Sequence, residues 1–214
     1  AGAKEVYLIH EPMAAALGIG IDVEEPVGNM IIDIGGGTTG ITVIALAGIV
    51  CDQSIRIAGD EFTADIMEAL RRYHSLLIGE RTAEQIKIQV GAAMKDLDNP
   101  PDDIPVNGRD LVTGIPKQVM VSYQEVAEAL DKSIFKIEEA ILKALETTPP
   151  ELAADIYRRG LYITGGGALL RGLDKRLTNK IKLPVHVADD PLKSVVRGTG
   201  IALKNYDRFP FVMR

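Results

Sequence analysis

Two runs of three glycines carry the chemistry that is most readily inferred from this sequence. The first run, Gly35 to Gly37, follows Asp33 and precedes the hydroxyl pair Thr38 and Thr39. Glycines let backbone N–H groups approach phosphate oxygens closely, and a neighbouring aspartate can hold Mg²⁺. A hairpin that simply turns on glycine is the alternative. The aspartate before the run and the threonines after it favour a phosphate-binding loop.

The second run, Gly165 to Gly167 followed by Ala168, also lies between an expected strand and an expected helix. Missing side chains let a flat ring or a phosphate lie against the backbone, and a helix N-terminus favours an anion. On its own, this run fits a tight strand-to-helix turn as well as it fits a ligand contact. The chain has no G-x-x-x-x-G-K-[ST] pattern, so it would bind a nucleotide without a P-loop.

Alternating strands and helices must position these two runs. Short apolar segments predict strands at residues 5–9, 29–34, 41–46, 49–54, 104–106, 119–121, 161–164 and 185–187. Helical spacing of apolar residues predicts helices at 12–18, 60–73, 82–93, 122–148, 150–159, from about 169, and 190–204. The pair Ser122 and Glu125 is a capping-box signature that starts the longest helix. This order of elements predicts an α/β sheet with helices on its faces.

Composition and charge narrow the functional classes. The chain has 214 residues and is 46% hydrophobic, which is enough for a sizeable core. A formal charge of -6 argues against nucleic acid as a partner.

The longest apolar run, residues 41–51, is well short of the roughly 20 residues that cross a bilayer. The single cysteine, Cys51, and the absence of an apparent signal peptide favour the cytoplasm. A start at Ala1, with an expected strand close behind, predicts a piece of a longer protein.

Six segments together resemble the MreB family of bacterial actins. They cover nearly the whole chain in the family's order: LIHEPMAAA (8–16), DIGGGTT (33–39), GERTAEQIK (79–87), GRDLVTG (108–114), TGGGALLRG (164–172) and VRGTG (196–200). Chaperone ATPases and sugar kinases of the same superfamily share the glycine loops, but the fourth segment resembles MreB more closely. The resemblance implies an actin-like ATPase domain with a ribonuclease H-like mixed sheet flanked by helices. Residues 1–51 and 117–214 would form this domain, and residues 52–116 would form a small inserted α+β subdomain.

The resemblance also implies roles for particular residues. The expected phosphate contacts are Asp33, which would also serve Mg²⁺, and Gly35, Gly36, Gly37 and Thr38. The expected adenosine contacts are Gly165, Gly166, Gly167 and Ala168. Glu84 and Lys87 would reach the ribose of ATP, since residues three apart share one helix face. An exposed ion pair is the alternative for these two. Glu11 would be the catalytic glutamate and, with Thr38, would position the attacking water.

Two positions depart from the family pattern. His10 stands where a second glutamate usually precedes Glu11, and Gly40 stands where a glutamate usually follows the paired threonines. Gly40 replaces a carboxylate that the family places near the phosphates, so a protein that hydrolyses ATP and one that only binds it both remain as alternatives. The first phosphate loop and the membrane-binding element of the family are expected in a preceding half that this chain lacks. Alone, the chain is therefore expected to be inactive.

The leading functional hypothesis is an ATP-binding, filament-forming protein of the cell-shape cytoskeleton. In full length it would hydrolyse ATP as it polymerises, and its partners would be further copies of itself and cell-wall synthesis proteins at the membrane. It would lie in the cytoplasm, peripheral to the inner face of the cell membrane. A sugar-kinase-type phosphotransferase and a non-catalytic interaction module of the same fold are the alternatives, the latter supported only by Gly40.

Overall fold

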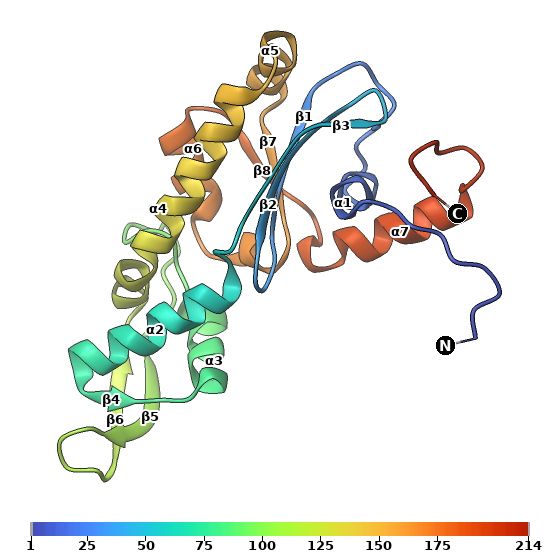
Figure 1. The fold of residues 1–214 in the computed structure, drawn as a ribbon. Helices are drawn as coiled ribbons and strands as arrows, with labels where there is room; N and C mark the ends of the chain where they lie inside the picture. Colours follow the sequence, from blue (N-terminus) through green and yellow to red (C-terminus); the bar gives the residue numbers. More distant parts are fainter. Residues whose placement is uncertain (1, 214) are drawn as a thin grey trace.

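A five-stranded mixed sheet forms the centre of the molecule, and the computed structural model describes residues 2–213 (Figure 1). Its strands lie in the order β3-β2-β1-β7-β8, with bounds β1 Asn29–Ile34, β2 Thr39–Ala45, β3 Gly48–Ile55, β7 Leu161–Thr164 and β8 Val185–Val187. The first three strands pair antiparallel, whereas β7 and β8 continue from β1 in parallel. Strands β1 and β2 are nearly continuous apolar runs because both of their faces are covered.

Helices cover both faces of this sheet (Figure 1). One face carries α1, Glu11–Gly18, and α7, Ser194–Lys204, whose apolar residues cluster with Ile31 and Ile44 of the sheet. The other face carries α4, Tyr123–Thr147, α5, Pro150–Arg159, and α6, Leu173–Ile181. Short 3₁₀ turns, η1 Gly166–Leu169 and η2 Pro191–Lys193, precede α6 and α7. The mixed sheet flanked by helices confirms the predicted fold class.

A second, antiparallel sheet lies at the far end of α4 (Figure 1). Its strands are β4 Leu76–Leu77, β5 Ile104–Asp110 and β6 Pro116–Val121, and it is accompanied by α2, Gly59–His74, and α3, Glu80–Val90. The expected domain boundaries, 51/52 and 116/117, stay a prediction. Each falls within a strand, β3 and β6 respectively, and the outermost residues 1 and 214 lie outside the described chain.

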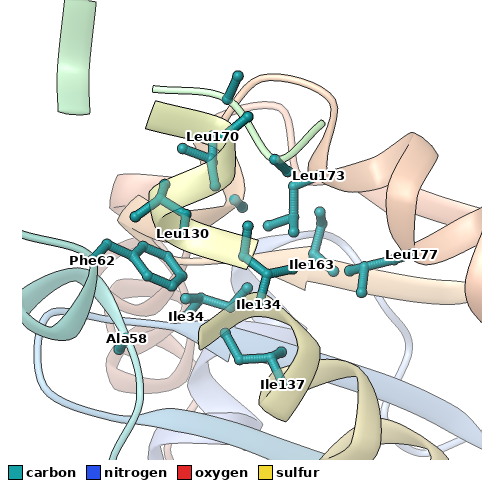
Figure 2. Close-up of a cluster of buried hydrophobic side chains, with 14 of the residues drawn as sticks. Ile34, Ala58, Phe62, Leu130, Ile134, Ile137, Ile163, Leu170, Leu173 and Leu177 are labelled. Carbon is teal, nitrogen blue, oxygen red and sulfur yellow. The ribbon is translucent and has the colours of Figure 1, made fainter. Parts of the chain in front are cut away.

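The long helix α4 joins the two sheets. Ser122 and Glu125 form the predicted capping box at its start, and its apolar face is buried along its length. In Figure 2, Leu130, Ile134 and Ile137 of this helix lie among Ile34 of β1 and Phe62 of α2. One hydrophobic core therefore runs beneath both sheets. Within residues 2–213, no helix combines the length and apolar character that crossing a bilayer requires.

Two predicted elements are wrong. Residues 5–9 form no strand: Leu8 makes a single bridge to Met213 and is 61% exposed. The segment has β-forming residues but no neighbouring strand, and strand formation depends on such packing. The helix expected from about residue 169 begins only at Leu173, because Gly172 takes a positive φ of 73° and interrupts the chain after the 3₁₀ turn.

Candidate functional site

A cavity of about 550 Å³ lies where the two glycine runs meet helices α2 and α3. Gly35 and Gly36 line it from the loop after β1, and Gly166 and Gly167 line it from the turn after β7. The remaining walls come from the start of α2, from one face of α3 and from three leucines: Gly59, Asp60, Phe62, Glu84, Lys87, Ile88, Leu169, Leu170 and Leu192. The cavity thus combines a backbone floor, charged side chains and an apolar wall.

The first glycine loop is held by the start of α2. The N–H of Gly35 donates to the carbonyl of Thr38 at 3.0 Å, which closes the turn. The N–H groups of Gly59 and Asp60 then donate to the carbonyls of Gly35 and Gly36, at 3.1 and 2.7 Å. These contacts satisfy N–H groups in the first turn of a helix, which have no partner within the helix itself. The loop conformation is therefore tied to the position of α2.

The second glycine run packs directly on the first strand. A Cβ on Gly165 would lie 2.3 Å from Oδ1 of Asp33, and a Cβ on Gly167 would lie 2.2 Å from Cγ2 of Ile34. Gly165 also has a positive φ of 81°. Only glycine fits these positions, so both runs are brought together at the carboxyl ends of β1 and β7. Ligands of open α/β sheets commonly bind at such an edge.

Glu84 and Lys87 lie on the same face of α3 and line the same cavity as Gly36 and Gly166. Their side chains form an ion pair of 2.5 Å. The hydroxyl of Thr63 on α2 lies 2.9 Å from Oε2 of Glu84. Burial would raise the pKa of the Glu84 carboxyl, but the hydrogen bonds from Lys87 and Thr63 outweigh it and lower the pKa. Glu84 therefore stays ionised at neutral pH.

Asp33 and Glu11 lie outside the cavity lining, and the Glu11 carboxylate is near enough to act on Asp33 electrostatically. Asp33 is half-buried, and its pKa rises from 3.8 to about 6, first because of burial and second because of the nearby Glu11 carboxylate. Within residues 2–213, the Asp33 side chain has no hydrogen bond or ion pair to offset this cost. A divalent cation would supply the missing charge, so the site fits Mg²⁺ through Asp33. Gly40 lies opposite Asp33 across the β1–β2 pair, with open space where its side chain would be.

The structure divides the residues expected from the sequence into two groups. One group lines the cavity: Gly35, Gly36, Glu84, Lys87, Gly166 and Gly167. The other group lies outside the cavity lining: Glu11, Asp33, Gly37, Thr38, Gly165 and Ala168. Gly37 and Thr38 are exposed, as is Glu11, at the first position of α1.

Several further residues of the site were missed from the sequence, among them Gly59 and Asp60 of the cavity lining and Thr63, which contacts Glu84. Oδ2 of Asp60 lies 3.7 Å from the Cβ position of Gly37, at the mouth of the cavity. A glycine–aspartate pair ahead of an amphipathic helix was the available signal. From the sequence, this pair could be assigned only to the start of a helix. Its contact with the first glycine run joins residues more than 20 positions apart, and local sequence patterns do not reveal such a contact.

Comparison with known proteins places the fold in the actin-like class. A MamK double helical filament structure shares 25% identity, with a TM-score of 0.72 over 94% of this chain and 59% of that one. The family described as MreB/Mbl protein matches residues 1–210. The chain belongs to this family, and the resemblance inferred from the six segments is confirmed.

Individual relatives are similar over nearly the whole chain. Cell shape-determining protein Mbl of Bacillus subtilis (strain 168) is 49% identical over 98% of this chain and 62% of its own length. Cell shape-determining protein MreB of Escherichia coli (strain K12) is 49% identical over 97% of this chain and 59% of its own length. MreB5 of Spiroplasma citri bound to ADP is 40% identical, with a TM-score of 0.92 over 97% of this chain and 62% of that one. The chain thus spans about three fifths of the length of its curated relatives.

Proposed function

We propose that this chain supplies one wall of an ATP-binding site in an actin-like filament protein that maintains rod cell shape. The observation that carries the proposal is the convergence of both glycine runs and the Glu84–Lys87 face of α3 on one cavity. Structures of MreB5 of Spiroplasma citri with ADP and with AMPPNP support an adenine nucleotide as the ligand. The opposite wall would come from the part of the relatives that this chain does not cover.

Each part of the site has a role in this proposal. The backbone of Gly35 to Gly37, with Thr38, would receive the phosphates, because the N–H groups there can approach without obstruction. Asp33 would hold Mg²⁺, which neutralises phosphate charge. The second run, Gly165 to Ala168, would lie against the adenosine. Glu84 would accept hydrogen bonds from the ribose hydroxyls, since its carboxylate is ionised and 46% exposed.

Hydrolysis is the second part of the proposal. Glu11 would orient the attacking water together with Thr38, at the end of β1 that carries Asp33. Gly40 removes the carboxylate that the family usually places there, and the space beside it is open. A Gly40→Glu variant should therefore be accommodated and should raise ATP turnover modestly. If neither the full-length parent nor its Gly40→Glu variant turns over ATP, the non-catalytic interaction module becomes the better interpretation of this chain.

The partners and location follow from the proposed class. The filament would consist of further copies of the same protein, and it would act with cell-wall synthesis proteins at the membrane. It would lie in the cytoplasm at the inner face of the cell membrane, with membrane contact made outside this chain. The relatives named cell shape-determining proteins support this role.

Nucleotide-dependent sedimentation of the full-length gene product tests the proposal. With ATP and Mg²⁺, the protein is expected to pellet as filaments, whereas a sugar-kinase-type enzyme would stay in the supernatant. Gly36→Val should abolish pelleting, because its side chain would project into the cavity where phosphate must approach. Gly79→Ala is the matched control, since a Cβ there meets nothing within 4 Å. Equal pelleting of the two variants with ATP and Mg²⁺, or pelleting of the parent protein without nucleotide, would contradict the proposal.

A further inference from the structure

One carboxylate of the described chain is buried in the core, and an arginine pairs with it. Glu138 of α4 has a side chain that is 4% exposed, and it is the only Asp, Glu, Lys or Arg within residues 2–213 that is buried. Nε of Arg176 on α6 donates to its Oε1 at 2.7 Å. Leu173 and Leu177, which flank Arg176 in the sequence, fix α6 in the core (Figure 2). Replacing a buried ion pair with apolar side chains is often neutral or stabilising, so stability alone does not explain this pair.

The Arg176 guanidinium also reaches the segment 91–93, which directly follows α3. Nη1 donates to the carbonyl of Ala93 at 2.9 Å and lies 2.8 Å from Oδ1 of Asp131 on α4. Nη2 donates to the carbonyl of Asp131 at 3.4 Å. A guanidinium presents five N–H donors in a rigid planar fork. Arg176 therefore joins α6, α4 and the exit from α3 through one side chain that is only 17% exposed.

The segment after α3 packs on the chain that leaves the second glycine run. The N–H of Ala93 donates to the carbonyl of Arg171 at 2.8 Å. A Cβ on Gly91 would lie 3.0 Å from Cδ1 of Leu170. Leu170 lines the cavity just after the second glycine run, and Ile88 lines it from the last turn of α3. This contact therefore sets the distance between α3 and the second glycine run.

From these contacts we infer that Arg176 is a positioning residue. It holds the segment 91–93 against residues 170–172 and thereby fixes the width of the cavity between α3 and the second glycine run. Arg176 itself lies outside the cavity lining. The inference rests on the proposed nucleotide site, in which this part of the cavity takes the base and the ribose. The phosphate part is held separately, by the N–H groups of Gly59 and Asp60 on the first glycine run.

Ligands with and without a base distinguish positioning from a general loss of structure. A wider cavity weakens the contacts of adenosine and of ADP by the same factor, because both contain the base and the ribose. Tripolyphosphate contains neither. When Arg176 is replaced, we expect the dissociation constants of adenosine and ADP to rise about tenfold, the upper range for one hydrogen bond. The dissociation constant of tripolyphosphate with Mg²⁺ should change less than about twofold.

The main test variant combines Arg176→Met with Glu138→Leu. Removing only the arginine leaves an unpaired charge in the core and is strongly destabilising, whereas the double variant replaces the pair with apolar side chains. Arg176→Lys is the second variant: it keeps a positive charge beside Glu138 but loses the planar fork, so the same changes are expected to a smaller extent. Lys180→Met is the matched control, because it removes an exposed charge from α6 and should change no dissociation constant more than about twofold. NMR titration of the full-length gene product measures all three ligands.

Hydrogen exchange without any nucleotide tests the same contact independently. In the double variant the amide of Ala93 should exchange about tenfold faster, because its hydrogen bond to Arg171 is weakened, while the amides of β1 and β2 exchange as slowly as in the parent. An unchanged Ala93 amide, equal acceleration in β1 and β2, unchanged adenosine binding, or an equal affinity loss for tripolyphosphate overturns the inference. If the double variant does not fold, Arg176→Lys decides by the same criteria. If the parent protein binds none of the three ligands, the proposed function fails, and the Ala93 amide still decides whether Arg176 holds the end of α3.

Discussion

Asp33 is the carboxylate at the point where the two glycine runs touch. Its pKa of about 6 means that the folded state holds a proton more tightly than the unfolded chain, where the pKa is 3.8. Between these values unfolding releases a proton, so the free energy of unfolding falls as pH rises. Above about pH 6 the loss is complete. This is the opposite of the usual carboxylate, which stabilises the fold as it ionises.

We expect Asp33→Asn to remove the fall in the free energy of unfolding that the Asp33 carboxyl causes as pH rises. The variant should gain about 1 kcal/mol at pH 7 over the parent, less than the full pKa shift implies because the carboxyl is partly exposed. At pH 3.5 the two should be nearly equal in stability. Urea unfolding of the chain at several pH values measures the difference, with the exposed Asp207→Asn as control. An advantage of Asp33→Asn over the parent that does not grow between pH 4 and pH 6 would contradict this assignment.

Glu11 is expected to act on turnover and not on affinity. A carboxylate that orients water works mainly in the transition state, so its loss lowers kcat and leaves ground-state binding nearly unchanged. In the full-length gene product, Glu11→Ala should reduce phosphate release about a hundredfold. Nucleotide affinity should change less than about twofold. Phosphate release at saturating ATP is the measurement.

The control for this experiment is Glu139→Ala, an exposed glutamate on α4. It removes the same charge far from α1 in sequence and should release phosphate at the parent rate. If Glu11→Ala turns over as fast as this control, Glu11 serves only as an acidic residue in the first turn of a helix, where the dipole favours it.

Residues of the site were predictable where their contacts are local or their chemistry is distinctive. The two glycine runs were predictable because glycine is read directly from the sequence, and its lack of a side chain lets the backbone approach a ligand closely. Glu84 and Lys87 could be placed on one face by helical spacing, and the structure places both at the cavity. The contact of Lys87 with Gly59 and Thr63 was not predictable, because these two residues reach it from another helix. Only three-dimensional packing decides which acceptors a lysine meets.

At the scale of elements, α1 and α7 cross in direct backbone contact. A Cβ on Gly18 would lie 1.8 Å from the carbonyl of Ser194, and a Cβ on Gly198 would lie 1.7 Å from the carbonyl of Ala14. The two backbones therefore touch without side chains between them. This contact holds α1, with Glu11 at its start, against the helix that follows η2.

Two alanine substitutions in α7 should have opposite effects. Gly198→Ala should lower the free energy of unfolding by about 3 kcal/mol, in the range of strong overpacking, because the added methyl would strike the backbone of α1. Gly200→Ala should raise it by about 0.5 to 1 kcal/mol, since its Cβ meets nothing within 4 Å and alanine favours a helix. Urea unfolding measures both. Similar midpoints for the two variants would show that the helices separate easily.

Elements with strong periodicity were predicted well, and those that depend on neighbours were not. The apolar spacing and capping box of α4 predicted its start to within one residue. Residues 5–9 have the composition of a strand, but the only strand-type pairing recorded for them within residues 2–213 is the single bridge of Leu8 to Met213, so composition alone was misleading. The helix expected from about residue 169 is preceded by a 3₁₀ turn, Gly166–Leu169, because Gly167 packs directly against Ile34 of β1.

At the scale of the whole molecule, this chain would supply only one wall of the proposed site. We expect the 214-residue chain to bind ATP weakly and to hydrolyse it negligibly. Positioning and electrostatic stabilisation account for nearly all catalysis of phosphoryl transfer, and part of both would come from outside this chain. Titration calorimetry should give a dissociation constant above about 100 μM, equivalent to less than about 5.5 kcal/mol. Submicromolar binding by the chain would refute the prediction.

The parallel pairing of β1 with β7 joins segments that leave the ribosome at different times. Met30 to Asp33 pair with Leu161 to Thr164, so about 130 residues must be made before β1 gains its second neighbour. At roughly 5–20 residues per second this takes on the order of ten seconds. During that interval β1, β2 and β3 form an antiparallel meander in which the apolar strand β1 has one edge without a neighbouring strand. Such an edge pairs readily with other chains. Nascent chains on neighbouring ribosomes are therefore most prone to aggregate before β7 emerges.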